Sequence, residues 1–408
     1  MSILDIIDKK RLKEQLTYDE LSFAFNGYLN KNVKDYQMSS LLMAICINGM
    51  TDQEIFDLTD IFIKSGDVLD FSFIDGVKVD KHSTGGIGDK TTLALVPIVA
   101  SLGIPVIKMS GRGLGYTGGT IDKLESIPGF NINLTSEEII SSVKNIGAVI
   151  TGQTANLVPL DKVIYALRDV TATVSSISLI AVSIMSKKIA GGADKIVIDV
   201  KVGSGALIKN LEDAEKLSNI MVKIGEKYNR EVRCIISDMS EPLGIYIGNS
   251  LEVIGAMNVL KNEGDPDLKN TIIQLASNMV SMAKGISVDD AILLVNNSIE
   301  SGMAWNKFQE IVENQGGRLL EIPVSNNRKD ILSTKSGKVR RIDALEVGKL
   351  SMALGAGRVN KEDSIDYSVG IKLNVKSGDD VEVGDVLCTL YLPDDPVYEI
   401  NEKLFDIR

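Results

Sequence analysis

The sequence predicts a chain of mixed class, α/β plus all-α, with three parts. They are a small discontinuous helical domain, a large α/β domain with a mixed or parallel sheet, and a small β-rich C-terminal domain. Three sequence patterns in the 408 residues predict this organisation. They are helical periodicity before residue 65, strand–loop–helix alternation from about residue 75, and short strand-like runs with glycine turns after about residue 330.

The first 65 residues predict short amphipathic helices. Thr17 with Glu20 and Thr51 with Glu54 have capping-box spacing before apolar stretches. Between them, DYQMSSLLMAICINGM (35–50) is mostly apolar, and we expect it at the centre of a helical cluster. Its second half, MAICINGM, fits a subunit interface and burial within the domain equally well.

The α/β domain is predicted from apolar runs that alternate with helical stretches. The strand-like runs are PVIKMS, GAVIT, KIVIDVKVG and VRCIISDMS, and a capping box at Thr135 and Glu138 starts a helix after residue 135. Sheets built from such repeats bind ligands at the carboxyl ends of their strands.

About thirty helix-compatible residues, 159–194, interrupt this alternation, and we assign them back to the helical domain. The predicted domains are therefore 1–65 with 160–193 (helical), 75–155 with 194–330 (α/β) and 331–408 (C-terminal). The crossings near residues 66–80 and 152–160 are expected to act as hinges.

Composition excludes several classes of function. The formal net charge of −11 opposes binding to nucleic acid or an anionic membrane. No apolar run reaches the roughly 18 residues of a membrane span, and the N-terminus lacks a signal-peptide core. Cys46, Cys234 and Cys388 are odd in number and widely spaced, which argues against disulfides and a cysteine zinc site. We expect a cytoplasmic protein without a metal ligand set.

A first glycine-rich segment, VDKHSTGGIGDKTT (79–92), can curl its backbone so that several N–H groups face one anion. Lys81 adds charge, and Ser83 and Thr92 add hydroxyl donors. The only histidine of the chain, His82, lies beside the loop; an ordinary glycine turn would place it there by chance. A P-loop is excluded because Asp89 precedes Lys90 where that motif has glycine.

A second glycine-rich segment, PVIKMSGRGLGYTGGTIDKLE, covers residues 105–125. A strand delivers Lys108 and Ser110 to its turn, and Thr120 opens the next helix, so two such loops could close around one small anion. Gly113, Gly115 and Gly118 also match the dinucleotide pattern G-x-G-x-x-G, which is weak here because the glycines follow the strand too late.

The segment 159–194 carries polar residues at helical spacing. Asp161, Tyr165 and Arg168 share one helix face, and Ser183 shares a face with Lys187. Arg168 and Lys187 only donate hydrogen bonds, so a partner with carbonyl oxygens, such as a pyrimidine edge, would suit them. Solvated charges and a serine bonded within its own helix are the alternative.

The stretches KHSTGGIGD, SGRGLGYTGGTIDKLESIPGF and YALRDVTATV…SIMSKKIAGGAD resemble the thymidine and pyrimidine-nucleoside phosphorylases, over nearly the whole chain. The resemblance implies two sets of ligands. The phosphate ligands are Lys81, Ser83, Thr92, Ser110 and Thr120, with Lys108 beside them, and the base-binding residues are His82, Tyr165, Arg168, Ser183 and Lys187. Lys108 is typical of the branch that also accepts uridine, and the family is dimeric.

Two departures concern a monovalent cation. The uridine-accepting branch holds potassium near Gly88, with carbonyls around residues 90, 243 and 246 and a glutamate at position 255. This chain has Gly255 and Lys90, so we expect no potassium site and expect the Lys90 ammonium to take the cation's place. Tyr116 also replaces a histidine of the family, with little expected consequence.

The implied reaction is reversible phosphorolysis of pyrimidine nucleosides (uridine, thymidine, deoxyuridine) to free base and α-(deoxy)ribose-1-phosphate, a pentosyl transfer in pyrimidine salvage. Arg168 and Lys187 would stabilise the departing base anion, His82 would act as general acid, and Asp161 could orient its imidazole. Inorganic phosphate is the co-substrate, no organic cofactor is needed, and closure of the two halves would exclude water.

Three rival functions remain from the sequence. A phosphoribosyltransferase of the anthranilate type shares the architecture but needs magnesium and a diphosphate sugar. A nucleotide-dependent oxidoreductase depends only on the Gly113/Gly115/Gly118 match. A non-enzymatic carrier is suggested by VKSGDDVEVGDVLCTL, which resembles biotinyl-lipoyl modules but lacks the carrier lysine at a hairpin tip.

Overall fold

The computed structural model describes the whole chain except residues 114, 117, 155, 359–362, 396–397 and 399–401. Its internal contacts divide the chain into two units. The first unit consists of Met1–Phe73, Gln153–Ile198 and Asn210–Cys234, and the second of Ile74–Gly152, Asp199–Lys209 and Ile235–Arg408. Strands β4 (Lys195–Val202) and β5 (Glu231–Asp238) each begin in the first unit and end in the second.

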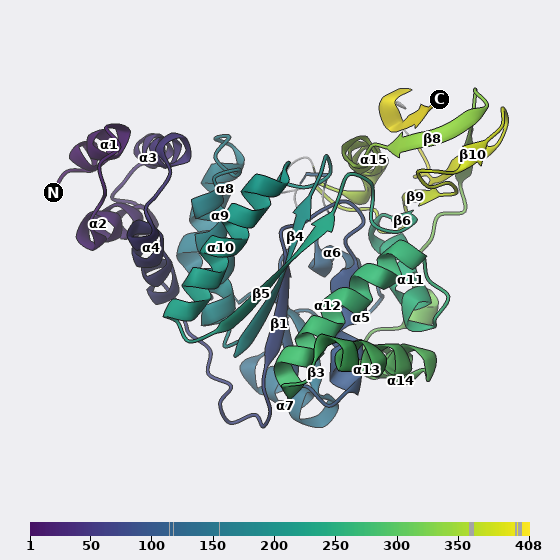
Figure 1. Ribbon diagram of the computed structural model, residues 1–408, viewed down its shortest axis with the longest axis horizontal. Helices are drawn as coiled ribbons and strands as arrows, with labels where there is room; N and C mark the ends of the chain where they lie inside the picture. The colour runs from purple at the N-terminus through teal and green to yellow at the C-terminus, as the bar shows by residue number, and fades with distance from the viewer. Residues whose placement is uncertain (114, 117, 155, 359–362, 396–397, 399–401) are drawn as a thin grey trace. The chain divides into compact units, whose positions relative to one another are not determined.

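The first unit is a bundle of helices (Figure 1). Its helices are α1 (Ile3–Arg11), α2 (Tyr18–Leu29), α3 (Asp35–Asn48), α4 (Asp52–Lys64), α8 (Pro159–Asp169), α9 (Ile177–Ala190) and α10 (Leu211–Lys227). Helix α4 packs on α2 and α9, and α8 packs on α2 and α3, so the segment after residue 159 lies in this bundle. The predicted capping boxes at Thr17 and Thr51 are present.

Helix α3 covers the apolar stretch 35–50 and buries one face. Met38, Leu41, Leu42 and Ile45 are fully buried, whereas Tyr36 is 71% and Ile47 is 74% exposed. The prediction that this stretch lies at the centre of the cluster therefore holds for one face only, because apolar residues occur all around the helix while neighbours cover only one side.

The second unit carries the predicted strand–helix alternation. Its elements up to residue 314 are β1 (Val79–Ser83), α5 (Thr91–Ser101), β2 (Val106–Ser110), α6 (Thr120–Glu125), α7 (Ser136–Ile146), β3 (Ala148–Gly152), β6 (Tyr246–Ile247), α11 (Asn249–Leu260), α12 (Pro266–Lys284), α13 (Val288–Glu300) and α14 (Met303–Asn314). Strands β2 and β3 pair in parallel, Val106 opposite Ala148, and a second sheet has the order β1-β4-β5. The capping box at Thr135 starts α7.

Helix α5 fixes the position of the first glycine-rich segment. It is apolar all round, every residue from Thr91 to Ala100 is buried, and it packs on β2, β3, α11, α12 and α14. A helix of this composition is stable only in the interior, so the loop that leads into it has one fixed end.

The C-terminal part is rich in short strands, as predicted. Its elements are η1 (Leu319–Glu321), β7 (Arg328–Leu332), β8 (Gly337–Ile342), α15 (Ala344–Ser351), the π-helical turn η2 (Met352–Ala356), β9 (Gly370–Leu373), β10 (Asp380–Val381), β11 (Val386–Tyr391), η3 (Glu402–Leu404) and β12 (Phe405–Ile407). The strand orders are β6-β9-β11-β7 and β10-β8-β12. Strand β6 thereby joins the C-terminal strands to the segment that precedes α11.

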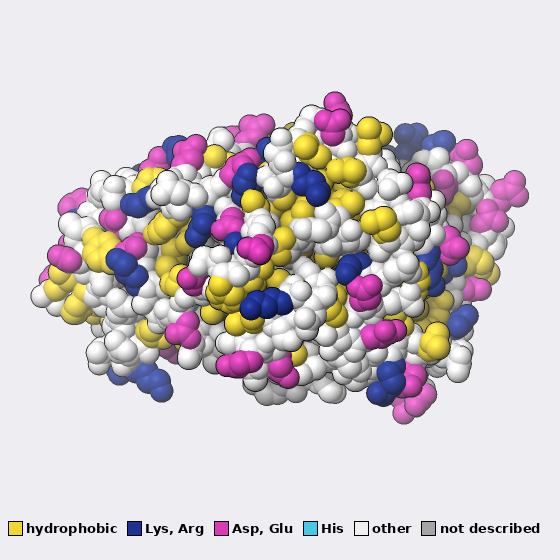
Figure 2. All heavy atoms as spheres, turned by 90° about the horizontal axis from the view of Figure 1, so that it is seen from below, with side chains coloured by type: hydrophobic (Ala, Val, Ile, Leu, Met, Phe, Trp, Pro, Cys, Tyr) yellow, Lys and Arg dark blue, Asp and Glu magenta, His cyan; other side chains and the backbone are white. Residues whose placement is uncertain are grey.

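The surface carries mixed charge. Figure 2 shows lysine and arginine side chains scattered among acidic ones on one face, without a continuous basic area. In the described residues no helix is long and apolar enough to cross a bilayer, and no cluster of three or more His, Cys, Asp or Glu side chains could hold a metal ion.

Candidate functional site

The Lys81 side chain lies in a buried ionic cluster beneath the first glycine-rich loop. Its ammonium donates to Thr91 Oγ1 at 2.6 Å and lies 3.4 Å from Asp199 and 3.9 Å from Asp89. Lys201 completes the cluster, 2.9 Å from Asp199 and 3.2 Å from Ser237 Oγ. Two lysines thus face two carboxylates.

These lysines hold Asp89 as a carboxylate. Burial alone would raise the pKa of Asp89, but the charges of Lys81, Lys201 and Lys123, with a hydrogen bond from Ser83, keep that pKa well below its ordinary value. Asp89 Oδ1 accepts hydrogen bonds from the backbone N–H and hydroxyl of Thr91, which fastens the first turn of α5 to the loop.

The loop itself is shaped by left-handed glycines. Gly85 (φ +91°) and Gly88 (φ +75°) adopt backbone angles that disfavour other residues. Ser83 Oγ accepts from the backbone N–H of Gly85 at 3.1 Å, which closes the turn. Thr92 is buried in the first turn of α5, an 11-residue helix whose N-terminus favours anions.

Strand β2 delivers Lys108 and Ser110 to the second loop, and both side chains are buried. The Lys108 ammonium lies 3.5 Å from Asp80 and donates to the carbonyl of Met109 at 3.1 Å. Ser110 Oγ, by contrast, has no hydrogen-bond partner among the described residues. A buried hydroxyl without a partner is costly, so this atom is a candidate ligand group.

The second loop is held at its start by Asp122. Asp122 Oδ2 accepts from the backbone N–H of Gly113 at 2.6 Å, and Oδ1 accepts from Arg358 Nη1 at 2.7 Å. Gly119 lies against this point, where a Cβ would come within 2.0 Å of Gly113 N. Thr120 is the first residue of α6. Leu114 and Thr117, which are part of the predicted motif, lie outside the described residues.

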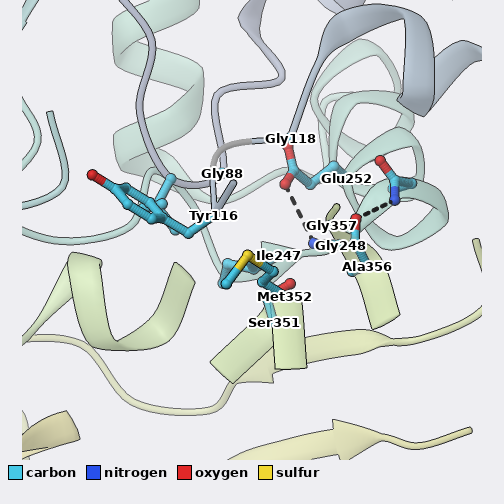
Figure 3. A pocket seen from close by; sticks show the side chains of 12 residues that line it. Gly88, Tyr116, Gly118, Ile247, Gly248, Glu252, Ser351, Met352, Ala356 and Gly357 are labelled. Carbon is cyan, nitrogen blue, oxygen red and sulfur yellow. Dashed lines mark hydrogen bonds between the residues drawn. The ribbon is translucent and has the colours of Figure 1, made fainter. Parts of the chain in front are cut away.

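The two glycine-rich loops lie side by side. The Lys123 ammonium donates both to the carbonyl of Asp89 in the first loop, at 2.6 Å, and to the carbonyl of Gly118 in the second, at 3.2 Å. Gly88 and Gly118 also line one hollow together with Gly248, Glu252 and Met352, which Figure 3 shows from close by.

Lys90 lies where the family's potassium would be expected. Its ammonium donates to the carbonyls of Leu243 and Tyr246, both at 2.7 Å. The stem of Lys90 passes Gly255, where a Cβ would lie 3.2 Å from Lys90 Cδ, so a larger residue at 255 would crowd the lysine. Burial lowers the pKa of Lys90 to about 8, against the opposing charge of Glu252.

The predicted base-binding residues, apart from His82, lie in the first unit. Lys187 Nζ donates to Asp161 Oδ2 at 2.6 Å and to Ser183 Oγ at 3.1 Å, so two of them form one cluster with Asp161 on α8 and α9. Asp161 Oδ1 is buried and has no hydrogen-bond partner within the described residues.

Arg168 has a structural task that its helical spacing did not reveal. Its guanidinium is buried and donates to the carbonyls of Thr173 (3.2 Å), Val174 (2.8 Å) and Leu179 (3.2 Å), which holds the turn between α8 and α9. These bonds use three of its five N–H groups. Tyr165 is 43% exposed, and its ring centroid lies 5.9 Å from Arg168 Cζ.

His82 belongs to the second unit, next to Lys81 in β1, and its side chain is half-buried. Sequence reasoning missed Asp122, Lys123, Asp199, Lys201 and Arg358. The only signal in the sequence for the first two was their place inside the second motif. Asp199 and Arg358 are distant in sequence from Lys81 and Asp122, which they contact, and Lys201 contacts the nearby Asp199.

Three family models match the chain. The helical bundle domain of a glycosyl transferase family matches residues 4–66, the a/b domain of the same family matches 75–305, and the pyrimidine nucleoside phosphorylase C-terminal domain matches 338–404.

Relatives match over the full length. The pyrimidine-nucleoside phosphorylase of Staphylococcus haemolyticus is 50% identical, with 99% of this chain and 95% of that protein covered. Those of Bacillus subtilis and Geobacillus stearothermophilus are 49% and 48% identical, each with 100% of this chain and 95% of the relative covered. The crystal structure of anthranilate phosphoribosyltransferase from Thermus thermophilus has a TM-score of 0.61 at 17% identity, covers 76% of this chain and 99% of that one, and shows similarity of fold.

Proposed function

Because this chain belongs to the pyrimidine-nucleoside phosphorylase family of pentosyltransferases, we propose that it converts uridine, thymidine and deoxyuridine with phosphate into free base and α-(deoxy)ribose-1-phosphate, in pyrimidine salvage. One observation carries the proposal furthest. Two glycine-rich loops lie side by side, and beside them the buried hydroxyl of Ser110 has no hydrogen-bond partner among the described residues. An oxyanion with several acceptor atoms would satisfy that hydroxyl.

Phosphate binding is assigned to the second unit. Ser110 offers a hydroxyl donor, Thr92 lies at the N-terminus of α5, and Thr120 opens α6. The Ser83 hydroxyl bonds to Asp89 and would have to turn toward the ion to act as the predicted donor. Lys81 and Lys108 supply positive charge from buried positions beside carboxylates. Their carboxylate partners keep the ammonium groups oriented, so phosphate meets charges already in place.

Base binding is assigned to the first unit. As the glycosidic bond stretches, negative charge builds on the pyrimidine, and Lys187 and Arg168 would donate to its carbonyl and N3 region. The bond from Lys187 to Ser183 Oγ sets both groups on one face of α9, and Tyr165 lies beside Arg168.

His82 is assigned the general-acid role at the base O2, because imidazole titrates near neutral pH. The family resemblance assigns Asp161 to orient it, and Asp161 Oδ1 accepts no hydrogen bond among the described residues. Phosphate then attacks the anomeric carbon from the opposite face, the C–N bond breaks, and its electrons leave with the base. No covalent enzyme intermediate is involved.

The test is incubation with uridine or thymidine, with and without phosphate and without added metal, followed by detection of free base. Release that needs phosphate supports the proposal. Consumption of free base together with a diphosphate sugar and magnesium, with release of diphosphate, would instead indicate a phosphoribosyltransferase, which shares the fold.

The residues at the position where the family resemblance implies a monovalent cation do not fit such an ion. Leu243 and Tyr246 already accept from the Lys90 ammonium, and Gly255 offers no carboxylate. We therefore propose that Lys90 replaces the cation and that activity is independent of potassium.

Activity should be equal in potassium and sodium buffers of the same ionic strength. The double variant Lys90→Ser/Gly255→Glu removes the ammonium and adds a carboxylate in the space that the lysine vacates. We expect the variant, unlike the parent, to need potassium. Strong potassium activation of the parent would contradict the proposal.

A further inference from the structure

We propose that Lys123 is a positioning residue that holds the two glycine-rich loops at the spacing that one phosphate ion requires. This inference rests on the proposed function, because it assigns both loops to the same ion. Lys123 lies on α6, one turn after Thr120, and it contributes no atom to the predicted ligand set.

The Lys123 ammonium makes two hydrogen bonds, one to a carbonyl of each loop, and forms an ion pair with Glu252. Nζ lies 2.6 Å from the Asp89 carbonyl, 3.2 Å from the Gly118 carbonyl and 3.0 Å from Glu252 Oε2. The side chain is 1% exposed. Two of its three donors therefore go to carbonyls in different loops. Its charge is paired with a carboxylate on α11.

Each loop carbonyl lies next to a predicted ligand-bearing segment. Asp89 leads through Lys90 into the turn that carries Thr92, and its carboxylate is 3.9 Å from Lys81. Gly118 comes two residues before Thr120. A shift of the Asp89 carbonyl would therefore move Thr92, and a shift of the Gly118 carbonyl would move Thr120.

We call Lys123 and its bonds to the Asp89 and Gly118 carbonyls the clamp, and Glu252 holds it in place through the ion pair. Glu252 lies on α11, it is buried, and its Oε1 accepts from the backbone N–H of Gly248 at 3.3 Å, a bond that Figure 3 shows as a dashed line. The carboxylate compensates the charge of Lys123 in the interior, where an unpaired ammonium would be costly. Helix α11 packs on both α5 and α6, so the clamp has rigid support.

The short helix α6 thus carries two residues that hydrogen-bond to the second loop. Asp122 holds its start through the N–H of Gly113, and Lys123 holds its end through the carbonyl of Gly118. Only Lys123 also reaches the first loop. This makes Lys123, and not Asp122, the residue that couples the two loops.

The experiment compares four forms of the full-length protein: the parent, Lys123→Met, Lys123→Met/Glu252→Gln and Lys10→Met. Methionine keeps the length of the stem and removes the donors. We expect the KM for phosphate to rise about tenfold or more in both Lys123 variants, with the KM for uridine changed less than about threefold. The double variant removes the unpaired carboxylate that could impair folding of the single one.

Lys10→Met is the matched control. Lys10 is likewise buried and paired with a buried glutamate, Glu54, at 2.7 Å, but it lies in the helical unit. We expect this variant to lose stability without a change in the KM for phosphate. If Lys123 had only a general structural role, its variants would show the Lys10→Met pattern, a loss of stability without a selective rise in the KM for phosphate.

Hydrogen–deuterium exchange provides a readout that does not depend on turnover. Amide exchange should rise in peptides covering residues 84–92 and 111–120 of the Lys123 variants and stay unchanged in β7 and β8. An unchanged phosphate KM, or faster exchange in only one loop, would overturn the coupling role. If the parent fails to release base from nucleosides with phosphate, the proposed function is wrong, and the exchange data alone decide whether the clamp exists.

Discussion

Buried lysine side chains serve two different purposes in the second unit. Lys81 and Lys201 face the carboxylates of Asp89 and Asp199, so their charges are balanced before any ligand binds. Lys90 instead places its ammonium on backbone carbonyls and joins separate segments of chain. The buried ammonium groups of this unit are therefore either paired with carboxylates or used to fix the backbone.

His82→Ala should lower kcat/KM for uridine by roughly 10²–10⁴-fold, because a general acid near neutral pH contributes that much. Steady-state kinetics at saturating phosphate measure it. His82→Gln, which can still donate a hydrogen bond, should retain more activity than alanine. A loss below about threefold would remove His82 from the mechanism.

Lys108→Met should reduce activity on uridine more than activity on thymidine. The buried ammonium can hydrogen-bond a 2′-hydroxyl, and methionine cannot. The ratio of kcat/KM values for the two nucleosides measures the effect. Equal losses on both substrates would contradict the assignment of Lys108 to sugar recognition.

Asp89→Asn should change how stability depends on pH. The pKa of Asp89 is lowered in the folded protein, so its carboxylate stabilises the fold above the ordinary value near 3.8, and this contribution is lost as the pH falls through the folded value. The variant should have a lower free energy of unfolding at about pH 7. That free energy should also fall less steeply than the parent's as the pH is lowered toward about 3. Urea unfolding across this range checks it, and parallel curves would argue against the shift.

At the scale of elements, helices α5 and α6 decide where the loops can lie. Helix α5 is buried on every side and fixes the end of the first loop. Helix α6 is short and depends on Asp122 and Lys123 for its attachment to the second loop. The first loop is therefore fixed by the buried helix α5, and the second loop is fixed by the hydrogen bonds of Asp122 and Lys123.

Gly119→Ala should raise the KM for phosphate, because its Cβ would come within 2.0 Å of Gly113 N and force the second loop apart. Gly111→Ala is the control in the same loop, since a Cβ at Gly111 meets no atom within 4 Å. We expect a change of about tenfold or more for Gly119→Ala and little for Gly111→Ala. Similar KM values for phosphate in both variants would show that the close approach of Gly119 to Gly113 is unimportant.

Local patterns predicted the elements well. Capping boxes at Thr17, Thr51 and Thr135 start helices where the sequence placed them, and the four strand-like runs became β2, β3, β4 and β5. A capping box involves residues only three positions apart, so it can form without contacts from distant parts of the chain.

Long-range contacts could not be predicted in the same way. Arg358 bonds to Asp122 across 236 residues, whereas the bond of Lys90 to Leu243 across 153 was expected only from the family resemblance. Neither pattern nor spacing relates such residues, because only the folded chain brings them together. For Arg168, helical spacing indicated an inward-facing side chain but not the three carbonyls that it meets.

At the scale of the molecule, helix α3 presents an apolar stripe that no part of its own bundle covers. Tyr36, Met43 and Ile47 are spaced along one side of the helix and are 71%, 37% and 74% exposed. We propose that a second copy of the chain covers this stripe in a homodimer, which is the assembly expected from the family resemblance.

Sedimentation should therefore give about twice the 44.2 kDa of the chain. Ile47→Glu should shift the protein toward the monomer, because a charge in an apolar interface is costly to bury. Leu293→Glu, on α13 at a position 69% exposed, is the matched control and should leave the mass unchanged. A parent that sediments as a monomer would rule out the dimer.

The bond between Asp122 and Arg358 also sets an order of events during synthesis. The ribosome must pass residue 358 of 408 before Asp122 meets its arginine and Gly115 gains the carbonyl of Arg358 as acceptor. A nascent chain that has already formed β1, β2 and α5 still lacks these late bonds. Products of premature termination before that point would lack these bonds at the second glycine-rich loop, however well their strands had folded.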